Sequence, residues 1–322
     1  MTDKNETVIT RQAYYSNELK AGPSSFNVSV PEIYQIEVTN ACNYSCDFCP
    51  RDTERMRRAN TFIDVELVKL IVERDFEGSY FTEFQLSGEP LLHKQLYEIV
   101  SLLKGKVLTG LSTNGSATNN SRNLEALMLI DYVTISIDSV TDYANVRKGG
   151  NWDKVLFNLR LLIHEIERRG SGPAVDLQLI EFPGYEKERD LLLEIVNTYN
   201  MQDFVTIRTI PDCFQSLTRQ HKPSASKEIC LNPWLSVTIQ ADGDVVPCCF
   251  AFGKEVVYGN LYNQSLKEIW ATSPVLQQLR NDMLTGTYNK LCGDCHMRSP
   301  TLLHWDLYTN TVKDRVLTSD SN

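Results

Sequence analysis

Short apolar runs alternate with longer amphipathic stretches through the middle of this chain. The runs, which are candidate strands, lie at residues 34–39, 83–87, 107–112, 132–137, 174–180 and 204–209. Segments whose apolar residues recur with a helical period follow them, at residues 64–75, 91–103, 124–129, 152–169 and 188–199. This alternation is typical of strand–helix units on a parallel sheet, because parallel strands need long crossover connections. It predicts an α/β fold whose chemistry lies at the carboxyl ends of the strands.

The pattern changes after residue 211. Residues 211–227 are rich in Pro, Ser, Gln and Lys, which indicates a link between two modules. Beyond the link, residues 234–240 and 245–248 are predicted to be strands joined by a tight Asp-Gly turn. Residues 266–284 have helical periodicity, with Ser265 placed to cap the helix. We predict four parts in chain order: an extension at 1–30, a large domain at 31–211, a small module at 212–308 and a tail at 309–322.

Charge and hydropathy exclude several kinds of partner. A net charge of -9 leaves no surplus of Lys and Arg to neutralise a phosphate backbone, so nucleic acid is a poor candidate for the main partner. The first 30 residues have neither a secretory signal pattern nor an apolar run of about 18 residues that would cross a membrane. We therefore expect a cytoplasmic protein that does not bind membranes.

The cysteines form two groups along the chain. A reducing cytosol disfavours structural disulfides, so nine cysteines point to metal binding or catalysis. The first group is Cys42, Cys46 and Cys49, just after the first predicted strand. The second group contains Cys230, Cys248, Cys249, Cys292 and Cys295, and only Cys213 lies outside both groups. Two groups of potential ligands predict two metal sites.

Three cysteines in the first group suit a cluster with one open iron. A four-iron cluster held entirely by protein uses four cysteines, so three leave one iron for an exchangeable ligand. A zinc site normally has a fourth protein ligand, and the nearest histidine is His93. Buried small thiols and a zinc half-site remain alternative interpretations of the spacing.

The spacing of this group, with an aromatic residue at Phe48, resembles the defining motif of the radical S-adenosylmethionine (SAM) superfamily. Three further segments resemble motifs of that family in the same order: Ser87-Gly88-Glu89-Pro90, Ser112-Thr113-Asn114-Gly115 and Ser136-Ile137-Asp138. Ser87 departs from the family's Gly-Gly-Glu-Pro pattern but keeps a small residue there. The resemblance implies a partial (β/α)6 TIM barrel of radical SAM type, with a 4Fe–4S cluster on the three cysteines and SAM on its open iron.

The same resemblance implies which residues bind SAM. Glu89 is expected to accept hydrogen bonds from the amino group of the methionine moiety, and the guanidinium fork of Arg147 to pair with its carboxylate. The other cofactor-binding residues implied in this way are Phe48, Ser87, Gly88, Ser112, Asn114 and Ser136. Each motif alone also has a plain structural interpretation, such as a helix start at Glu89-Pro90 or a turn at Asn114-Gly115.

The second group of cysteines and its surroundings resemble the SPASM or twitch modules that follow the barrel in part of this superfamily. The resemblance implies a β-hairpin plus helix module that holds one auxiliary 4Fe–4S cluster, with Cys230, Cys248, Cys292 and Cys295 as its ligands. Cys249 is then surplus, although Cys248 and Cys249 remain exchangeable in this role. A four-cysteine zinc site is the alternative.

Family resemblance implies that the enzyme cleaves SAM reductively, with an external one-electron donor, and removes a hydrogen atom from its substrate. One candidate substrate is a ribosomally made precursor peptide that is cross-linked, epimerised or cleaved. The short N-terminal extension would then require a separate leader-recognition protein. The other candidate is an aminocyclitol or carbohydrate that is oxidised, which the twitch-like cysteine count favours. We prefer the peptide, and a non-enzymatic metal-binding protein is the remaining alternative.

The sequence identifies further catalytic residues only weakly. Arg208 follows the sixth predicted strand closely enough to reach a substrate, although a salt bridge is an equal interpretation. Cys213 is a candidate hydrogen donor, and an inert thiol is the commoner outcome. Glu181 lies near a strand end and is a weaker candidate.

Overall fold

The structure is a computed structural model that describes residues 30–53, 57–76, 79, 81–212, 229–251, 253–293 and 295. Nine strands within these residues form one sheet. The strands are β1 (Ile33–Ile36), β2 (Phe81–Phe84), β3 (Leu108–Thr113), β4 (Tyr132–Ser136), β5 (Ala174–Ile180), β6 (Val205–Ile210), β7 (Ser236–Ile239), β8 (Asp244–Val246) and β9 (Gly259–Asn260). Their order across the sheet is β6-β5-β4-β3-β2-β1-β7-β8-β9. The pairs from β6 to β7 are parallel and the last two are antiparallel.

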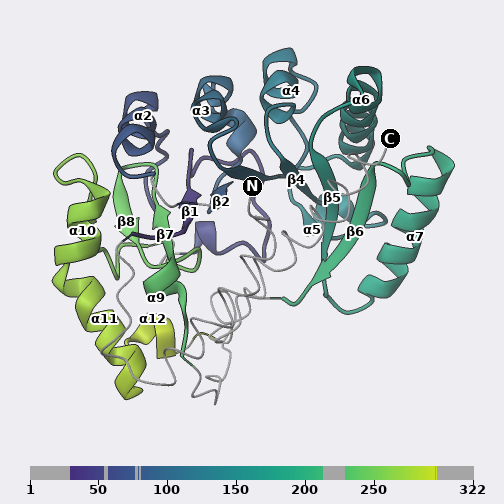
Figure 1. Ribbon diagram of the computed structural model, residues 1–322. Coiled ribbons are helices and arrows are strands. Elements are labelled where there is room, and N and C mark those ends of the chain that lie inside the picture. The colour runs from purple at the N-terminus through teal and green to yellow at the C-terminus, as the bar shows by residue number, and fades with distance from the viewer. Residues whose placement is uncertain are drawn as a thin grey trace.

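Helices connect the parallel strands and cover the outer side of the curved sheet (Figure 1). The connecting helices are α2 (Val65–Arg74), α3 (Leu96–Leu103), α4 (Ser121–Leu127), α5 (Tyr143–Val146), α6 (Trp152–Arg169) and α7 (Tyr185–Thr198), with short 3-10 turns η2 (Pro50–Asp52) and η3 (Pro90–Leu92). The C-terminal part contributes α9 (Asn232–Leu235), α10 (Leu266–Thr272), α11 (Pro274–Thr285) and α12 (Lys290–Gly293). This arrangement confirms the predicted α/β fold with the character of a partial barrel.

The register of the strands separates a polar face from an apolar face. Ile36, Leu111 and Leu177 lie on the apolar face and belong to the hydrophobic core. The opposite face carries polar side chains from successive strands: Gln35, Glu37, Glu83, Ser112, Thr134, Asp176, Gln178, Arg208 and Thr238. Side chains alternate between the two faces of a strand, and helices need an apolar surface to pack on. The polar face is therefore the inner face of the partial barrel.

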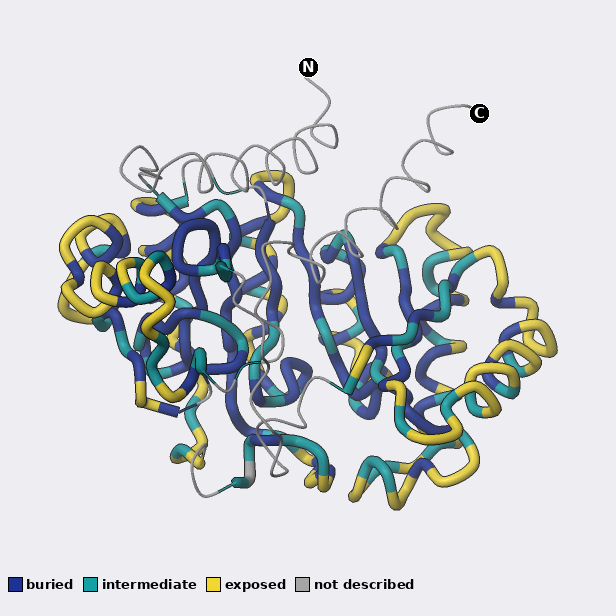
Figure 2. Tube along the Cα trace, turned by 90° about the horizontal axis from the view of Figure 1, so that it is seen from below, coloured by how far each residue is buried: buried dark blue, intermediate teal, exposed yellow. Residues whose placement is uncertain are grey.

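Buried residues follow the strands, whereas exposed residues lie mainly along the outer sides of the helices (Figure 2). Many polar residues of the inner face are nevertheless buried, including Glu37, Glu83 and Asp176. Buried carboxylates are costly unless they are paired or hydrogen-bonded, so this face must hold partners for them. Within the described part of the chain, no helix combines the length and apolar character that a membrane span needs.

The C-terminal strands join the sheet of the large domain instead of forming a separate one. β7 pairs in parallel with β1, from Ile33 opposite Ser236 to Ile36 opposite Ile239. β8 and β9 then extend the sheet as an antiparallel hairpin and edge. The hairpin prediction is confirmed, and its turn is close to β1. The boundaries proposed at residues 30, 211 and 308 stay predictions.

Two predictions for the C-terminal part were wrong in detail. Residues 234–240 do not start as a strand, because Asn232 begins the helical turn α9, which Pro233 favours, and the strand β7 starts only at Ser236. The predicted helix at 266–284 is two helices, since Pro274 cannot continue α10 and instead begins α11. The cap at Ser265 is confirmed as a reciprocal capping box with Glu268.

Candidate active site

The first group of cysteines lies in the loop that follows β1, at the carboxyl end of the sheet. Cys46 is buried, Cys42 and Cys49 are half-buried, and all three are free thiols. Each thiol lies within electrostatic range of another of the three, and burial raises the pKa of each. The loop is held by the segment after α5, where the Ser45 amide donates to the carbonyl of Lys148 at 2.9 Å.

The turn after β2 packs directly against the start of this loop. A Cβ atom at Gly88 would lie 2.0 Å from the carbonyl oxygen of Thr39 and 2.8 Å from that of Ala41, so only glycine fits. The amide of Glu89 donates to the same Ala41 carbonyl at 2.8 Å. The Ser87-Gly88-Glu89-Pro90 turn therefore fixes the backbone immediately before Cys42.

The carboxylate of Glu89 joins the turn to the end of β3. It is 2% exposed and accepts from Thr113 Oγ1 at 2.6 Å, from the Asn114 amide at 2.7 Å and from the Leu91 amide at 3.1 Å. Burial raises the pKa of Glu89, while these hydrogen bonds act in the opposite direction. A carboxylate has about four acceptor sites, and these hydrogen bonds use three of them.

Asn114 connects this turn to the cysteine loop. Its Nδ2 donates to Asn43 Oδ1 at 3.0 Å and lies 4.0 Å from Cys42 Sγ. Asn43 in turn donates to Ser116 Oγ at 2.8 Å. The structure therefore brings together the Cys42, Glu89 and Asn114 motifs, which are separated along the sequence.

Arg147 forms a buried ion pair with Asp138 that the sequence did not predict. Its Nη2 binds Asp138 Oδ2, while Asp138 Oδ1 accepts from the Ile180 amide at 2.8 Å. Burial alone would lower the pKa of Arg147, but Asp138 and neighbouring groups raise it. The Nε atom of Arg147 is buried without a hydrogen-bond partner among the described residues. The guanidinium lies 5.5 Å from the ring centroid of Phe48, so it faces the cysteine loop.

The remaining candidates lie on or near the polar face. Ser112 Oγ donates to Glu83 at 3.5 Å, and Ser136 ends β4 opposite Gln178. Arg208 is 8% exposed and pairs with Asp176 at 2.7 Å, so the structure favours a buried salt bridge on the inner face.

The structure gives no support for a catalytic role of the two other weak candidates, Glu181 and Cys213. Glu181 is exposed and accepts from Thr209 Oγ1 at 2.9 Å. Cys213 lies outside the described residues.

The second group of cysteines gathers beside the β8 hairpin. Burial, together with Cys249, Cys230 and Cys295, raises the pKa of the Cys248 thiol well above its usual value. Tyr258, a buried residue, lies within electrostatic range of Cys248 and Cys292, and burial raises its pKa well above the usual range. The structure thus brings Cys230, Cys248, Cys249, Cys292 and Cys295 into one neighbourhood and leaves open which of Cys248 and Cys249 is the ligand.

The donor sets fit iron–sulfur clusters. Both sites are made of thiols, which are soft ligands that suit iron–sulfur clusters and zinc. Cysteines on a cluster each bind a different iron, whereas zinc draws its ligands to one atom. Metals bind thiolates rather than thiols, so a metal centre at these sites would displace the thiol protons.

Comparison with known families agrees with this geometry. The model of the radical SAM superfamily matches residues 36–172, and that of SPASM, an iron-sulfur cluster-binding domain, matches residues 230–296. The chain belongs to the radical SAM superfamily. It is a radical SAM enzyme with a C-terminal SPASM domain, and its cofactors are a 4Fe–4S cluster, an auxiliary iron–sulfur cluster and SAM.

Two kinds of protein have sequences similar to parts or most of this chain. An S-adenosyl-L-methionine-dependent 2-deoxy-scyllo-inosamine dehydrogenase of Niallia circulans is 22% identical over 273 residues, which cover 81% of this chain and 91% of the relative. A probable GTP 3',8-cyclase of Thermococcus kodakarensis is 29% identical over 107 residues, 33% of this chain. The matched segment spans only 34% of that cyclase.

Solved radical SAM structures share the fold at low sequence identity. BtrN in complex with AdoMet and 2-DOIA has a TM-score of 0.52 and 19% identity, covering 84% of this chain and 96% of BtrN. SuiB of Streptococcus suis bound to the precursor peptide SuiA has a TM-score of 0.59 and 13% identity, covering 89% of this chain and 73% of SuiB. AnSMEcpe with bound AdoMet has a TM-score of 0.58 and 13% identity, and the match covers 90% of this chain and 95% of anSMEcpe.

Proposed function

We propose that this radical SAM enzyme cleaves SAM reductively and removes a hydrogen atom from a ribosomally made precursor peptide, which it cross-links, epimerises or cleaves. The observation that carries the radical chemistry is the loop with Cys42, Cys46 and Cys49 at the carboxyl end of a polar, buried sheet face. The three thiols would hold the SAM-binding cluster. When bound, the reduced cluster and SAM supply a 5'-deoxyadenosyl radical that takes a hydrogen atom from an unactivated C–H bond.

The residues around the loop suit the binding of a methionine moiety. Glu89, fixed by Thr113 and Asn114, keeps acceptor capacity for an amino group. Arg147 is positioned by Asp138 and has a buried Nε donor left for a carboxylate. Phe48, Ser87, Gly88, Ser112 and Ser136 complete the proposed SAM site, in which the buried inner face excludes water.

The width of the polar face supports a peptide substrate. Strands in a sheet lie about 4.8 Å apart, so the seven parallel strands from β6 to β7 span about 30 Å. This distance follows the curved sheet, and we propose that SAM and an extended peptide segment bind side by side along it. A peptide substrate requires recognition of its leader, for which we propose a separate protein, and an external one-electron donor reduces the clusters.

A second candidate function is the oxidation of an aminocyclitol or carbohydrate. It is favoured by the similarity to the 2-deoxy-scyllo-inosamine dehydrogenase, which extends over 81% of this chain.

In both functions we propose that the auxiliary centre is one 4Fe–4S cluster on Cys230, Cys248, Cys292 and Cys295. Full ligation by protein leaves no iron open, so this cluster would accept an electron from the substrate radical. We also propose that the enzyme acts in the cytoplasm, where its thiols stay reduced.

Iron content and SAM cleavage test the assignment of the two clusters. Anaerobically prepared protein should contain about eight irons, and the triple change of Cys42, Cys46 and Cys49 to Ala should leave about four. That variant should form no 5'-deoxyadenosine with SAM and dithionite. A paired variant with Cys292→Ala and Cys295→Ala should lose about half of the iron and keep the spectral change that SAM causes at the first cluster. Reductive SAM cleavage by the triple variant would show that the active site lies elsewhere.

Deuterium transfer distinguishes the two substrate classes. The enzyme would be incubated with SAM, dithionite and either a deuterated candidate precursor peptide or deuterated 2-deoxy-scyllo-inosamine. We expect deuterium to appear in 5'-deoxyadenosine only with the peptide. Transfer from the aminocyclitol alone would replace the peptide proposal by the dehydrogenase.

A further inference from the structure

An arginine that belongs to none of the recognised motifs is held inside the C-terminal module. Arg280 lies on α11 and is half-buried, and its Nε donates to the carbonyl of Pro233 at 2.9 Å. Pro233 belongs to α9, which begins shortly after Cys230. The guanidinium carbon of Arg280 lies 4.7 Å from the centroid of the Trp270 ring on α10. The guanidinium is therefore fixed between α9 and α10, near the segment that carries Cys230.

One end of this guanidinium is buried without a partner. Its Nη2 has no hydrogen-bond acceptor among the described residues, and no carboxylate in that part of the chain forms an ion pair with Arg280. Burial lowers the pKa of Arg280, and Tyr258 acts in the opposite direction. A buried cation is costly unless an anion compensates for it. Arg280 therefore needs negative charge that the described carboxylates do not supply.

Tyr258 links the arginine to the second group of cysteines. Its amide donates to the carbonyl of Val245 on β8 at 2.7 Å, and Cys248 follows the same strand. The hydroxyl of Tyr258 is buried and has no hydrogen-bond partner among the described residues. Cys248, Cys292 and Arg280 all lie within electrostatic range of this one side chain. The backbone of the hairpin thus places the cysteines and the arginine around the same buried tyrosine.

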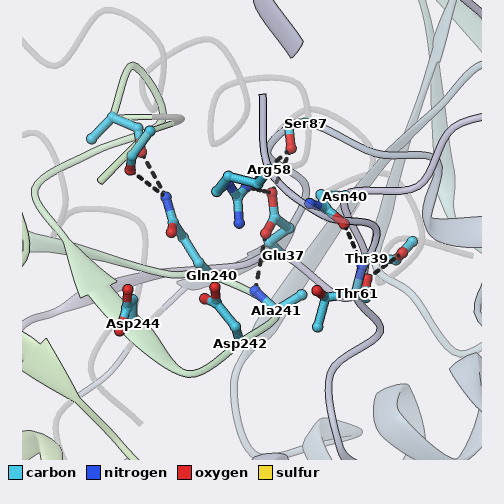
Figure 3. Close-up of polar contacts among 12 residues, drawn as sticks. Glu37, Thr39, Asn40, Arg58, Thr61, Ser87, Gln240, Ala241, Asp242 and Asp244 are labelled. Atoms are coloured by element: carbon cyan, nitrogen blue, oxygen red, sulfur yellow. Dashed lines mark hydrogen bonds and ion pairs between the residues drawn. The ribbon is translucent and has the colours of Figure 1, made fainter. Parts of the chain in front are cut away.

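The loop that carries Cys248 is fixed to the hairpin as well. Gln240 is 0% exposed, and its Nε2 donates to the carbonyls of Ala251 at 2.8 Å and Gly253 at 3.2 Å, the two bonds that Figure 3 shows at Gln240. The amide of Ala251 donates in turn to the carbonyl of Cys248 at 3.0 Å. Such anchoring holds Cys248 and Tyr258 at a set separation, so the charge of Arg280 acts on the cysteine group from a fixed position.

A 4Fe–4S cluster is the anion that this module would hold. Four thiolate ligands give such a cluster a net negative charge, which grows by one unit when the cluster gains an electron. A fixed positive charge nearby stabilises the reduced form more than the oxidised form and so raises the reduction potential. The charge that Arg280 lacks and the charge that the cluster brings are therefore complementary.

We propose that Arg280 supplies the positive charge that favours the reduced form of the auxiliary cluster. This assignment rests on the proposed function, because it explains how that cluster would accept one electron from the substrate radical. Arg280 acts through the cluster and is a positioning residue, since it contacts neither SAM nor substrate in this assignment. Tyr258 fills the space beside the cysteines and keeps water away from the same group.

An EPR-monitored redox titration of the anaerobic enzyme with both clusters tests the role of Arg280. Arg280→Gln should make the auxiliary potential more negative, by at least about tenfold in the reduction equilibrium, which is about 59 mV for one electron. Arg280→Lys keeps the charge but loses the Nε donor to Pro233 and the stacking on Trp270. Its auxiliary potential should stay closer to that of the wild type than to that of Arg280→Gln. The potential of the first cluster, measured in the same samples, should not change.

A matched control and the iron content separate charge from packing. Lys267→Gln removes one exposed positive charge from α10 and should leave both potentials unchanged. If Arg280→Gln loses about half of its iron while Arg280→Lys keeps about eight irons, the charge is needed to hold the cluster, which also supports the assignment. An unchanged auxiliary potential in Arg280→Gln would overturn it. So would an Arg280→Lys enzyme that falls as far as Arg280→Gln in potential or in iron content, because the loss of packing would then explain both variants.

The proposed function fails by a different result. An enzyme that shows the shift of the auxiliary potential but forms no 5'-deoxyadenosine from SAM and dithionite has the charge effect without the radical chemistry. Formation of 5'-deoxyadenosine with an unchanged auxiliary potential in Arg280→Gln shows the reverse.

Discussion

Adding one methyl group at Gly88 should damage both stability and the first cluster. The Cβ of alanine would lie 2.0 Å from the Thr39 carbonyl oxygen and 2.7 Å from the Thr39 carbonyl carbon. Because real Cβ contacts are not shorter than 3.0 Å, the two backbone segments must separate by about 1 Å. Overpacking of this kind costs about 1–3 kcal/mol, and stretching the Glu89–Ala41 hydrogen bond adds about 1 kcal/mol.

We therefore expect Gly88→Ala to lower the free energy of unfolding by about 2–4 kcal/mol, measured by anaerobic urea denaturation. The shift also moves Ala41, next to Cys42, so the variant should lose the spectral response to SAM. Gly105→Ala is the control, because its φ is +75° and no atom lies within 4 Å of the added Cβ. It should cost about 1–2 kcal/mol and keep that response. A Gly88→Ala enzyme as stable and SAM-responsive as the wild type would refute the close approach.

Three further predictions concern other parts of the molecule. Tyr258→Phe should make the reduction potential of the auxiliary cluster more negative in an EPR redox titration, because it removes a buried hydroxyl close to Cys248. Ser265→Ala should lower the free energy of unfolding by about 1 kcal/mol in urea, since it breaks the capping box of α10. Burial would raise the pKa of Glu188, but hydrogen bonds from Thr141 and two amides lower it overall. Its stabilisation is therefore complete above the unfolded pKa of about 4.3 and is lost as the pH falls through the lower folded pKa. The difference between the urea midpoints of wild type and Glu188→Gln should stay constant above about pH 5.5 and shrink below about pH 4.

Local signals in the sequence were sufficient for the strand–helix units and the motifs. The cysteine loop follows β1 as expected, and the turn at Gly88 and the end of β3 at Asn114 meet it. These predictions succeeded because each depends on a short segment and on the rule that parallel strands end at the same edge. The break at Pro274 was also visible in the sequence, since proline ends or begins a helix.

Contacts between distant segments could not be predicted in this way. The pairing of β7 with β1 joins residues about 200 positions apart, and no local pattern specifies it. The Arg147–Asp138 pair depends on the turn after β4, where Asp138 has a positive φ of 61°. Glu37 and Arg58 belong to none of the motifs recognised in the sequence, so their buried ion pair became visible only in the structure.

One signal of the inner face was nevertheless present in the sequence. Strands of a parallel sheet that are covered on both faces are nearly continuous apolar runs. Here β1, β5 and β7 alternate instead, with Gln35 and Glu37, Asp176 and Gln178, and Thr238 as polar positions between apolar ones. Because such alternation leaves one face of a parallel strand without an apolar partner, it indicates a polar inner face whose groups need hydrogen-bond or ionic partners. In this protein that face is where we place SAM and the substrate, so the same alternation that forms the sheet also positions the chemistry.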